Sequence, residues 1–187
     1  LGRWGAEWIQ RVGEVAPKRC GHCSGKEVIS AEEAVSKIQA AVDARRDADF
    51  MVMARTDAAA TLGFEAAIER AQKFAEAGAD ILFVEAVTKE DEVRALPQRL
   101  STPQLMNMVI GGKTPIFRAE ELGRLGYGIV LYANAALQGA VMGMQKALTA
   151  LRDDKQVLES SGLVASFAER QRLVGKPQWD ELERRYT

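Results

Sequence analysis

Short apolar runs alternate with helical patterns along most of the chain, and this alternation constrains the fold more than any other feature of the sequence. Continuous apolar runs of strand length are typical of parallel strands that are buried on both faces. Their repeat of roughly 20–30 residues has the size of one strand–helix unit. The runs cover residues 50–54, 81–84, 104–109 and 129–133, and a fifth candidate strand covers 8–12.

Amphipathic helices are predicted between these runs. Ser30 and Glu33 form a capping box, S-x-x-E, that predicts the start of one helix. Thr88 and Asp91 predict the cap of a shorter helix, which Pro97 limits. Apolar residues at helical spacing occupy 31–42, 64–75, 119–125 and 137–151, and Gly78 and Gly126 are placed to end the second and third of these helices.

Polar side chains lie at the carboxyl ends of four successive predicted strands. They are Arg55 and Asp57 after the first run, Glu85 after the second, Asn107 late in the third and Asn134 after the fourth. A (β/α)8 barrel builds its active site from the carboxyl ends of its strands. The alternative, an open doubly wound sheet, is not supported by a nucleotide-binding glycine motif in the sequence. We therefore predict an α/β fold of the TIM-barrel type.

The chain is short for such a barrel. A complete barrel needs ~250 residues, whereas this chain has 187. We therefore predict that it lacks the N-terminal strand–helix units. Residues 1–153 are predicted to form a partial barrel, and 154–187 a C-terminal helical segment. In that segment Trp179, Leu182 and Tyr186 share one helical face, which favours docking because a lone short helix does not stay folded.

Composition and charge exclude several classes of function. The chain has 25 basic and 26 acidic residues, so it carries no electrostatic footprint for nucleic acid. No apolar run approaches the ~20 residues that span a bilayer, so we expect no membrane partner. Two cysteines do not make a disulfide framework, and a single histidine excludes sites that need several. A reducing, cytoplasmic setting is expected.

The segment around Cys20 carries most of the chemical information. Lys18, Arg19 and His22 surround Cys20 with positive charge, which favours the reactive thiolate. Together with Cys23, the segment also matches the C-x-x-C pattern of thiol–disulfide oxidoreductases, but Ser24-Gly25 follows where that fold continues a helix. A structural metal site lacks a fourth ligand here.

These motifs, in this order, resemble those of the isocitrate lyase / phosphoenolpyruvate mutase superfamily. The resemblance covers nearly everything from Val15 onward. The matching stretches are Pro17-Lys18-Arg19-Cys20-Gly21-His22, Gly25-Lys26, Ala54-Arg55-Thr56-Asp57-Ala58, Phe83-Val84-Glu85-Ala86, Asn107-Met108 and Tyr132-Ala133-Asn134. The most similar branch includes methylisocitrate lyase, dimethylmalate lyase and carboxyphosphonoenolpyruvate phosphonomutase-like proteins.

The resemblance implies a lyase that cleaves a C–C bond of a small 2-hydroxy or 2-oxo di- or tricarboxylate through an enolate. It implies that Cys20 protonates the enolate and that Arg55 and Glu85 complete the catalytic set. Its substrate-binding residues would be Gly21, His22, Asn107 and Asp57, and the alternative role for Asp57 is to support Arg55. Phosphonomutase-type P–C chemistry is the alternative, and thiol–disulfide exchange or an inactive fragment is less favoured.

The resemblance also implies a cofactor and an assembly. Members of the superfamily depend on Mg²⁺, for which Mn²⁺ can substitute, and Glu14 is the one candidate ligand in this chain; the remaining ligands lie on strands that the chain lacks. Gln138 stands where relatives that act on tricarboxylates carry arginine, which favours a smaller substrate. A homotetramer that exchanges C-terminal helices is expected.

Overall fold

The computed structural model describes residues 6–15 and 27–186. The chain forms two compact units, residues 1–133 and 134–187. This division falls at the start of the long helix over 135–153, whereas the predicted boundary falls at its end, so the assignment of that helix to the barrel stays a prediction. Among the described helices, none combines the length and the hydropathy that a membrane span requires.

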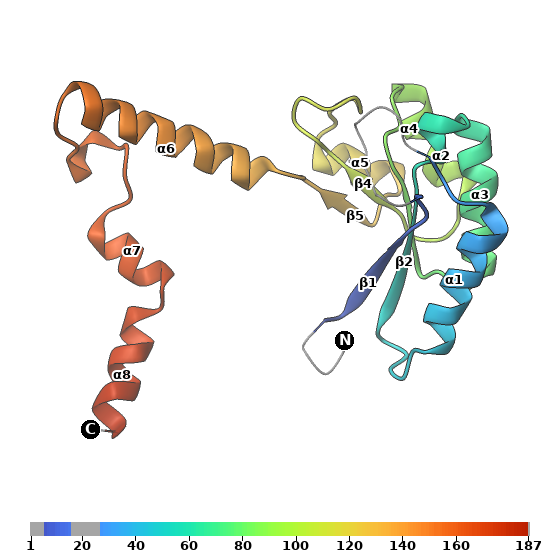
Figure 1. The fold of residues 1–187 in the computed structure, drawn as a ribbon, viewed down its shortest axis with the longest axis horizontal. Coiled ribbons are helices and arrows are strands. Elements are labelled where there is room, and N and C mark those ends of the chain that lie inside the picture. The colour runs from blue at the N-terminus through green and yellow to red at the C-terminus, as the bar shows by residue number, and fades with distance from the viewer. Residues whose placement is uncertain (1–5, 16–26, 187) are drawn as a thin grey trace. The chain divides into compact units, whose positions relative to one another are not determined.

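Unit 1 alternates strands and helices, as the sequence predicts (Figure 1). All of its strand pairs are parallel. An isolated parallel bridge joins Leu82 of β3 to Gln104, the residue before β4, so the strands follow chain order across the unit. The elements are β1 (Trp8–Val12), α1 (Ala31–Asp43), β2 (Met51–Thr56), α2 (Ala58–Thr61), α3 (Phe64–Glu76), β3 (Ile81–Val84), α4 (Glu90–Arg99), β4 (Leu105–Asn107), α5 (Ala119–Leu125) and β5 (Ile129–Leu131).

The strand and helix predictions are confirmed with two corrections, both at α4. The candidate strand 8–12 forms, and Ser30 caps α1 by accepting a hydrogen bond from the Glu33 amide at 3.0 Å. The predicted cap at Thr88 is wrong, because α4 begins one residue later, after Lys89, and no side chain caps it. Pro97 lies inside α4 rather than at its end, and the helix continues to Arg99.

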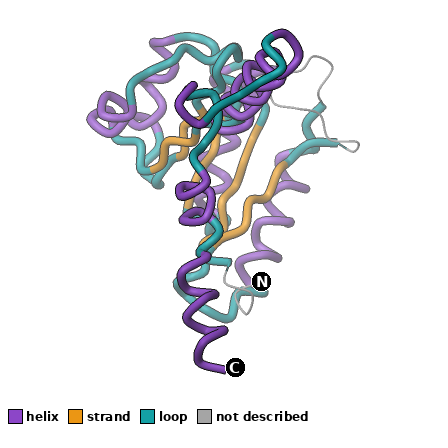
Figure 2. The backbone as a smooth tube through the Cα atoms, turned by 90° about the vertical axis from the view of Figure 1, so that its left-hand side faces the viewer, coloured by secondary structure: helices purple, strands orange, loops and turns teal. Residues whose placement is uncertain are grey.

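The two faces of the sheet carry different apolar clusters. On one face the central strands pack against the helices, and α1 and α3 lie along the sheet in Figure 1. Figure 2 shows the strands in orange with helices in purple beside them. On the other face Met53, Ile81, Phe83 and Leu105 form a separate buried cluster. Strand residues of even and odd number thus enter different cores, which is the period-2 alternation of a sheet buried on both faces.

Unit 2 consists of helices, none of which has a fully buried residue. It contains α6 (Ala135–Asp153), a short 3-10 turn at Glu159–Ser161, α7 (Phe167–Leu173) and α8 (Lys176–Tyr186). Ser166 caps α7 through the Glu169 amide at 3.1 Å. The predicted helical face of Trp179, Leu182 and Tyr186 forms on α8, where the three side chains are 66%, 44% and 77% exposed.

Burial in unit 1 predicts a clear difference between two leucine substitutions. Leu96 on α4 is 1% exposed, whereas Leu62 is 62% exposed. Leu96→Ala should lower the free energy of unfolding by about 2–5 kcal/mol, because it removes buried methylenes and leaves a cavity. Leu62→Ala should change it by less than about 0.5 kcal/mol. Urea unfolding of both variants measures the difference, and equal losses would contradict this packing.

Candidate functional site

Four acidic or amide side chains come level at the carboxyl ends of neighbouring strands. Val12 pairs with Arg55, so two residues further Glu14 lies level with Asp57. Thr56 pairs with Val84, so Asp57 comes level with Glu85 one residue on. Leu82 pairs with Gln104, so three residues on Glu85 comes level with Asn107. We call Glu14, Asp57, Glu85 and Asn107 the strand-end row.

Arg55 lies on β2, two residues before Asp57, and its side chain extends to the carboxylates of the row. Its Nε and Nη2 donate to the two carboxylate oxygens of Asp57, each at 2.9 Å. Nη1 lies 3.5 Å from Glu85 Oε2, and Nη2 lies 3.8 Å from Glu14 Oε1. The Cζ atom of Arg55 also stands 5.0 Å from the ring centroid of Phe83, within the range of a cation–π interaction.

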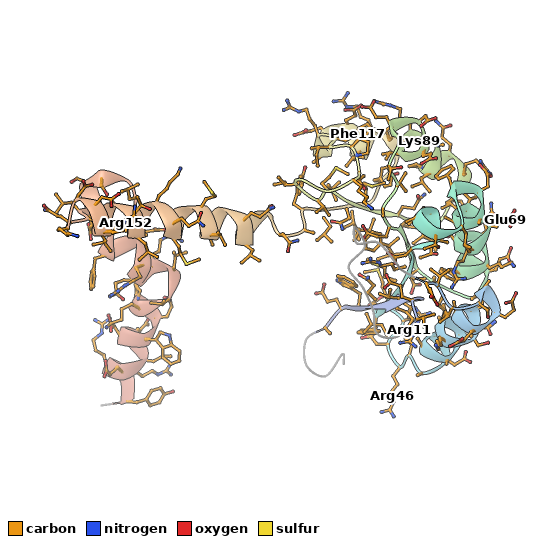
Figure 3. The ribbon with its side chains drawn as sticks, turned by 45° about the horizontal axis from the view of Figure 1, so that its top comes forward. Arg11, Arg46, Glu69, Lys89, Phe117 and Arg152 are labelled. Carbon is orange, nitrogen blue, oxygen red and sulfur yellow. The ribbon has the colours of Figure 1, made fainter. Side chains whose placement is uncertain are left out.

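The electrostatics of Arg55 keep it charged. Burial by itself lowers the pKa of Arg55, but the hydrogen bonds to Asp57 and the charges of Glu85, Asp57 and Glu14 raise it above its ordinary value. The three carboxylates are between 0% and 3% exposed at their side chains, and Arg55 is 10% exposed. Arg46, by contrast, is exposed and points away from the body of the unit (Figure 3). Arg55 is thus a buried, fixed cation.

Asn107 extends the row toward β5. Its Nδ2 donates to Glu85 Oε2 at 3.3 Å, which fixes the orientation of the amide. Its Oδ1 is buried and accepts no hydrogen bond from any residue that the structure describes. Buried acceptors are nearly always satisfied in native proteins, so this oxygen is placed to accept from a ligand.

The ends of the Cys20 segment are held beside the row. The amide of Val15 donates to the Glu27 carbonyl at 3.0 Å, and Glu14 forms an antiparallel bridge with Val28. Packing beneath is close at Gly13, where a Cβ would stand 3.1 Å from Arg70 Nη2 and the arginine side chain would have to shift. The two ends of the Cys20 segment, Val15 and Glu27, therefore lie side by side. They are next to Glu14, which forms an ion pair with Arg55.

The structure brings together Glu14, Arg55, Asp57, Glu85 and Asn107 from the predicted site. The other predicted members, Cys20, Gly21 and His22, lie outside the described residues, so their roles stay predictions.

Sequence reasoning missed Phe83 and Gly13. Phe83 reads as an ordinary member of an apolar run, and its contact with Arg55 follows only from the register of β2 and β3.

The described residues do not assemble a metal site. Across 6–15 and 27–186, no group of three or more histidine, cysteine, aspartate or glutamate side chains is arranged to hold an ion. The guanidinium of Arg55 lies among the three carboxylates of the row. A metal ion bound by these carboxylates would compete with Arg55 for them. The prediction that Glu14 contributes to a Mg²⁺ site stays a prediction, since the other ligands of that site are expected outside these residues.

Comparison with known proteins finds enzymes that are similar to this chain in sequence and in fold. The chain is 41% identical over 183 residues to 2,3-dimethylmalate lyase of Eubacterium barkeri, which covers 98% of this chain and 63% of that protein. The structure of oxaloacetate acetylhydrolase in complex with 3,3-difluorooxalacetate superposes on this chain with a TM-score of 0.90 and 31% sequence identity. The match covers 97% of this chain and 62% of the chain in that structure. A structure of 2,3-dimethylmalate lyase, described as a PEP mutase/isocitrate lyase superfamily member, matches 98% and 61% with a TM-score of 0.88 and 32% identity.

The chain thus spans less than two thirds of the length of each of these proteins. The model of the phosphoenolpyruvate phosphomutase family matches residues 18–152. The motifs around Arg55, Glu85 and Asn107 lie within that range. The resemblance drawn from the sequence is confirmed: the chain belongs to the phosphoenolpyruvate phosphomutase family, within the superfamily that includes isocitrate lyase.

Proposed function

We propose that this chain supplies the carboxyl-terminal strands of a (β/α)8 barrel that cleaves a carbon–carbon bond in a small 2-hydroxy or 2-oxo acid. The observation that carries the proposal is the buried guanidinium of Arg55, fixed among carboxylates where parallel strands end. A fixed cation in a dry site can bind a carboxylate and stabilise an oxyanion. The names of the relatives, dimethylmalate lyase and oxaloacetate acetylhydrolase, support this reaction class.

Exposed apolar residues at both edges of the sheet support closure of a barrel. On the face of the second cluster, Trp8 and Met51 at one end are 44% and 36% exposed, and Ile129 and Leu131 on β5 are 36% and 42% exposed. Parallel sheets normally bury both faces and leave few open edges. Further strands between β5 and β1 would cover these residues.

The reaction that we propose conserves atoms and charge within the site. The hydroxyl of a 2-hydroxy acid loses its proton, and the C–C bond breaks as the oxygen becomes a carbonyl. For a 2-oxo acid, water first adds to the ketone, and a hydroxyl of this hydrate loses its proton in the same way, so that a carboxylic acid leaves in place of the carbonyl product. The departing electron pair forms the enolate of the second product, whose carbon then takes a proton. Carboxylates such as Glu85 can accept the hydroxyl proton, and Arg55 binds a substrate carboxylate beside the developing charge.

Asn107 favours a hydroxy acid over an oxo acid. Its Oδ1 is a buried acceptor, and its Nδ2 is already engaged with Glu85. A substrate hydroxyl can donate to this oxygen, whereas a ketone oxygen can only accept. A site built around a buried acceptor discriminates strongly against a ligand that lacks the donor.

Cys20 is the proposed donor of the proton to the enolate carbon. It belongs to the segment between Val15 and Glu27, whose ends are hydrogen-bonded to each other beside Glu14. A thiol is a suitable acid for a carbanion, and the family resemblance assigns it this role. We assign Gly21 and His22 to substrate binding on the same basis, and Cys23 has no assigned role.

Anion binding in this site requires further positive charge. The row and Arg55 comprise three carboxylates and one guanidinium, so their formal charges sum to −2. A dicarboxylate would be repelled unless cations approach, and Lys18 and Arg19 in the Cys20 segment are candidates. Mg²⁺, with Mn²⁺ as a substitute, remains our proposed cofactor by resemblance, and such an ion would stabilise the enolate.

The exposed face of α8 supports an assembly. Trp179, Leu182 and Tyr186 present adjacent apolar surface on a helix of eleven residues, too short to be stable by itself. We propose that α8 docks on a second copy of the chain in a homotetramer.

Substitution of the two cysteines tests the proposed chemistry. With Mg²⁺ and dimethylmalate, methylisocitrate or oxaloacetate, Cys20→Ser should lower turnover by roughly 10²–10⁴-fold, because it removes the general acid. Cys23→Ser should stay within about twofold of the wild type, since the mechanism does not use that thiol. Release of the carbonyl product measures both, and phosphonopyruvate in the same panel tests the phosphonomutase alternative. Equal loss in both variants, together with lost insulin reduction, would instead identify a dithiol oxidoreductase.

The proposed tetramer predicts that a single substitution on α8 lowers the mass of the assembly in solution. Trp179→Asp should shift the tetramer toward smaller species in sedimentation at micromolar concentration, because a charge would be buried in the interface. Glu181→Ala, a change on the same helix away from the aromatic face, should leave the distribution unchanged. An unchanged mass for Trp179→Asp would exclude docking through this face.

A further inference from the structure

We propose that Asp57 is a positioning residue for Arg55, with the ring of Phe83 as its second support, and that it acts on the substrate only through that guanidinium. The inference rests on the proposed function for its catalytic consequence. It differs from the prediction that Asp57 binds substrate directly. It also assigns a role to Phe83, which the sequence places in an ordinary apolar run.

The hydrogen-bond geometry supports this assignment. Asp57 is 0% exposed, and its two oxygens accept from Nε and Nη2 of Arg55, one edge of the planar fork. Of the five N–H donors of a guanidinium, two are thereby used. The other donors, on Nη1 and the far side of Nη2, make no hydrogen bond to any residue that the structure describes. The edge opposite the chain is thus left for a carboxylate.

The other two carboxylates attract Arg55 without holding it. Glu85 and Glu14 lie 3.5 and 3.8 Å from its terminal nitrogens, beyond the 2.7–3.2 Å of an ordinary N–H···O bond. Without Asp57, small rotations of the side chain would close these distances and turn the outer edge away from a substrate. Asp57 therefore decides which nitrogens remain available.

Phe83 restrains the guanidinium in the remaining direction. Its ring faces Cζ of Arg55 at 5.0 Å from the neighbouring position of β3, and it is only 2% exposed. A hydrogen-bonded edge and a stacked face together fix a planar group in both rotation and tilt. Arginine at such a site is not replaceable by lysine, which lacks the plane.

A purely electrostatic role for Asp57 predicts the opposite result. Asp57→Asn removes one negative charge from a site whose formal charge is negative. The loss of that charge by itself would strengthen the binding of an anion. Loss of positioning would weaken it. Glu14→Gln is the matched control, because it removes one charge near Arg55 without breaking a hydrogen bond that Arg55 donates.

The test follows the Arg55 side chain directly by ¹⁵N relaxation of its Nε–H group in the full chain. We expect an order parameter near the ~0.85 of rigid groups in the wild type and in Glu14→Gln, and below ~0.6 in Asp57→Asn. Asp57→Glu should restore part of the order, and Phe83→Leu should give an intermediate value. If the Nε–H group stays rigid in Asp57→Asn and Phe83→Leu, the positioning role is wrong.

Kinetics then separate this inference from the proposed function. When introduced into the wild type, Asp57→Asn should lower kcat/KM by roughly 10–100-fold, mainly by raising KM. When introduced into the Arg55→Lys variant, it should lower kcat/KM by less than about twofold. An equal loss in both backgrounds would contradict action through Arg55. If Arg55 loses order as expected while the wild type cleaves none of the acids, the proposed function fails and the positioning role stands. Should Asp57→Asn not fold, Phe83→Leu carries the same two measurements.

Discussion

A single buried cation organises the site, and the parallel register of the strands makes its burial possible. An isolated charge in a protein interior is costly, so Arg55 requires partners with short, well-formed hydrogen bonds. Asp57 supplies them from the position directly after β2 and just before α2, where its carboxylate meets the guanidinium edge-on. Glu14 and Glu85 come from the two neighbouring strands at the same level. No single strand could provide this arrangement.

The apolar runs explain why the strands and part of the site were predictable. Each run ends where the chain meets polar surroundings, so Arg55, Glu85 and Asn107 mark strand ends in the sequence itself. Support of Arg55 by Asp57 was one of the two roles that the sequence allowed for Asp57, but the two-oxygen geometry depends on rotamers, which residue order does not give. Phe83 was hidden for another reason: an aromatic in a buried strand reads as core whether or not a cation stacks on it.

The misplaced cap of α4 shows the limit of local signals. Thr88 is a good capping residue, but the chain enters the helix after Lys89, with no side-chain cap. Acidic residues Glu90, Asp91 and Glu92 in the first turn stabilise that end through the helix dipole instead. Pro97 is tolerated within the helix, and it packs close to Gly126, where a Cβ would stand 3.1 Å from its own. Tertiary contacts thus override the local pattern.

The charge balance of the site argues for coupling between substrate binding and the Cys20 segment. The three carboxylates around Arg55 also repel an anionic substrate, and together with Arg55 their formal charges sum to −2. The sequence places Lys18 and Arg19 next to Cys20, in a segment whose two ends are hydrogen-bonded beside Glu14. Cations that offset the surplus would therefore arrive on the same piece of chain as the proposed proton donor. In the proposed function, the charges that bind the anion and the thiol that protonates the enolate carbon thus belong to one short stretch of the sequence.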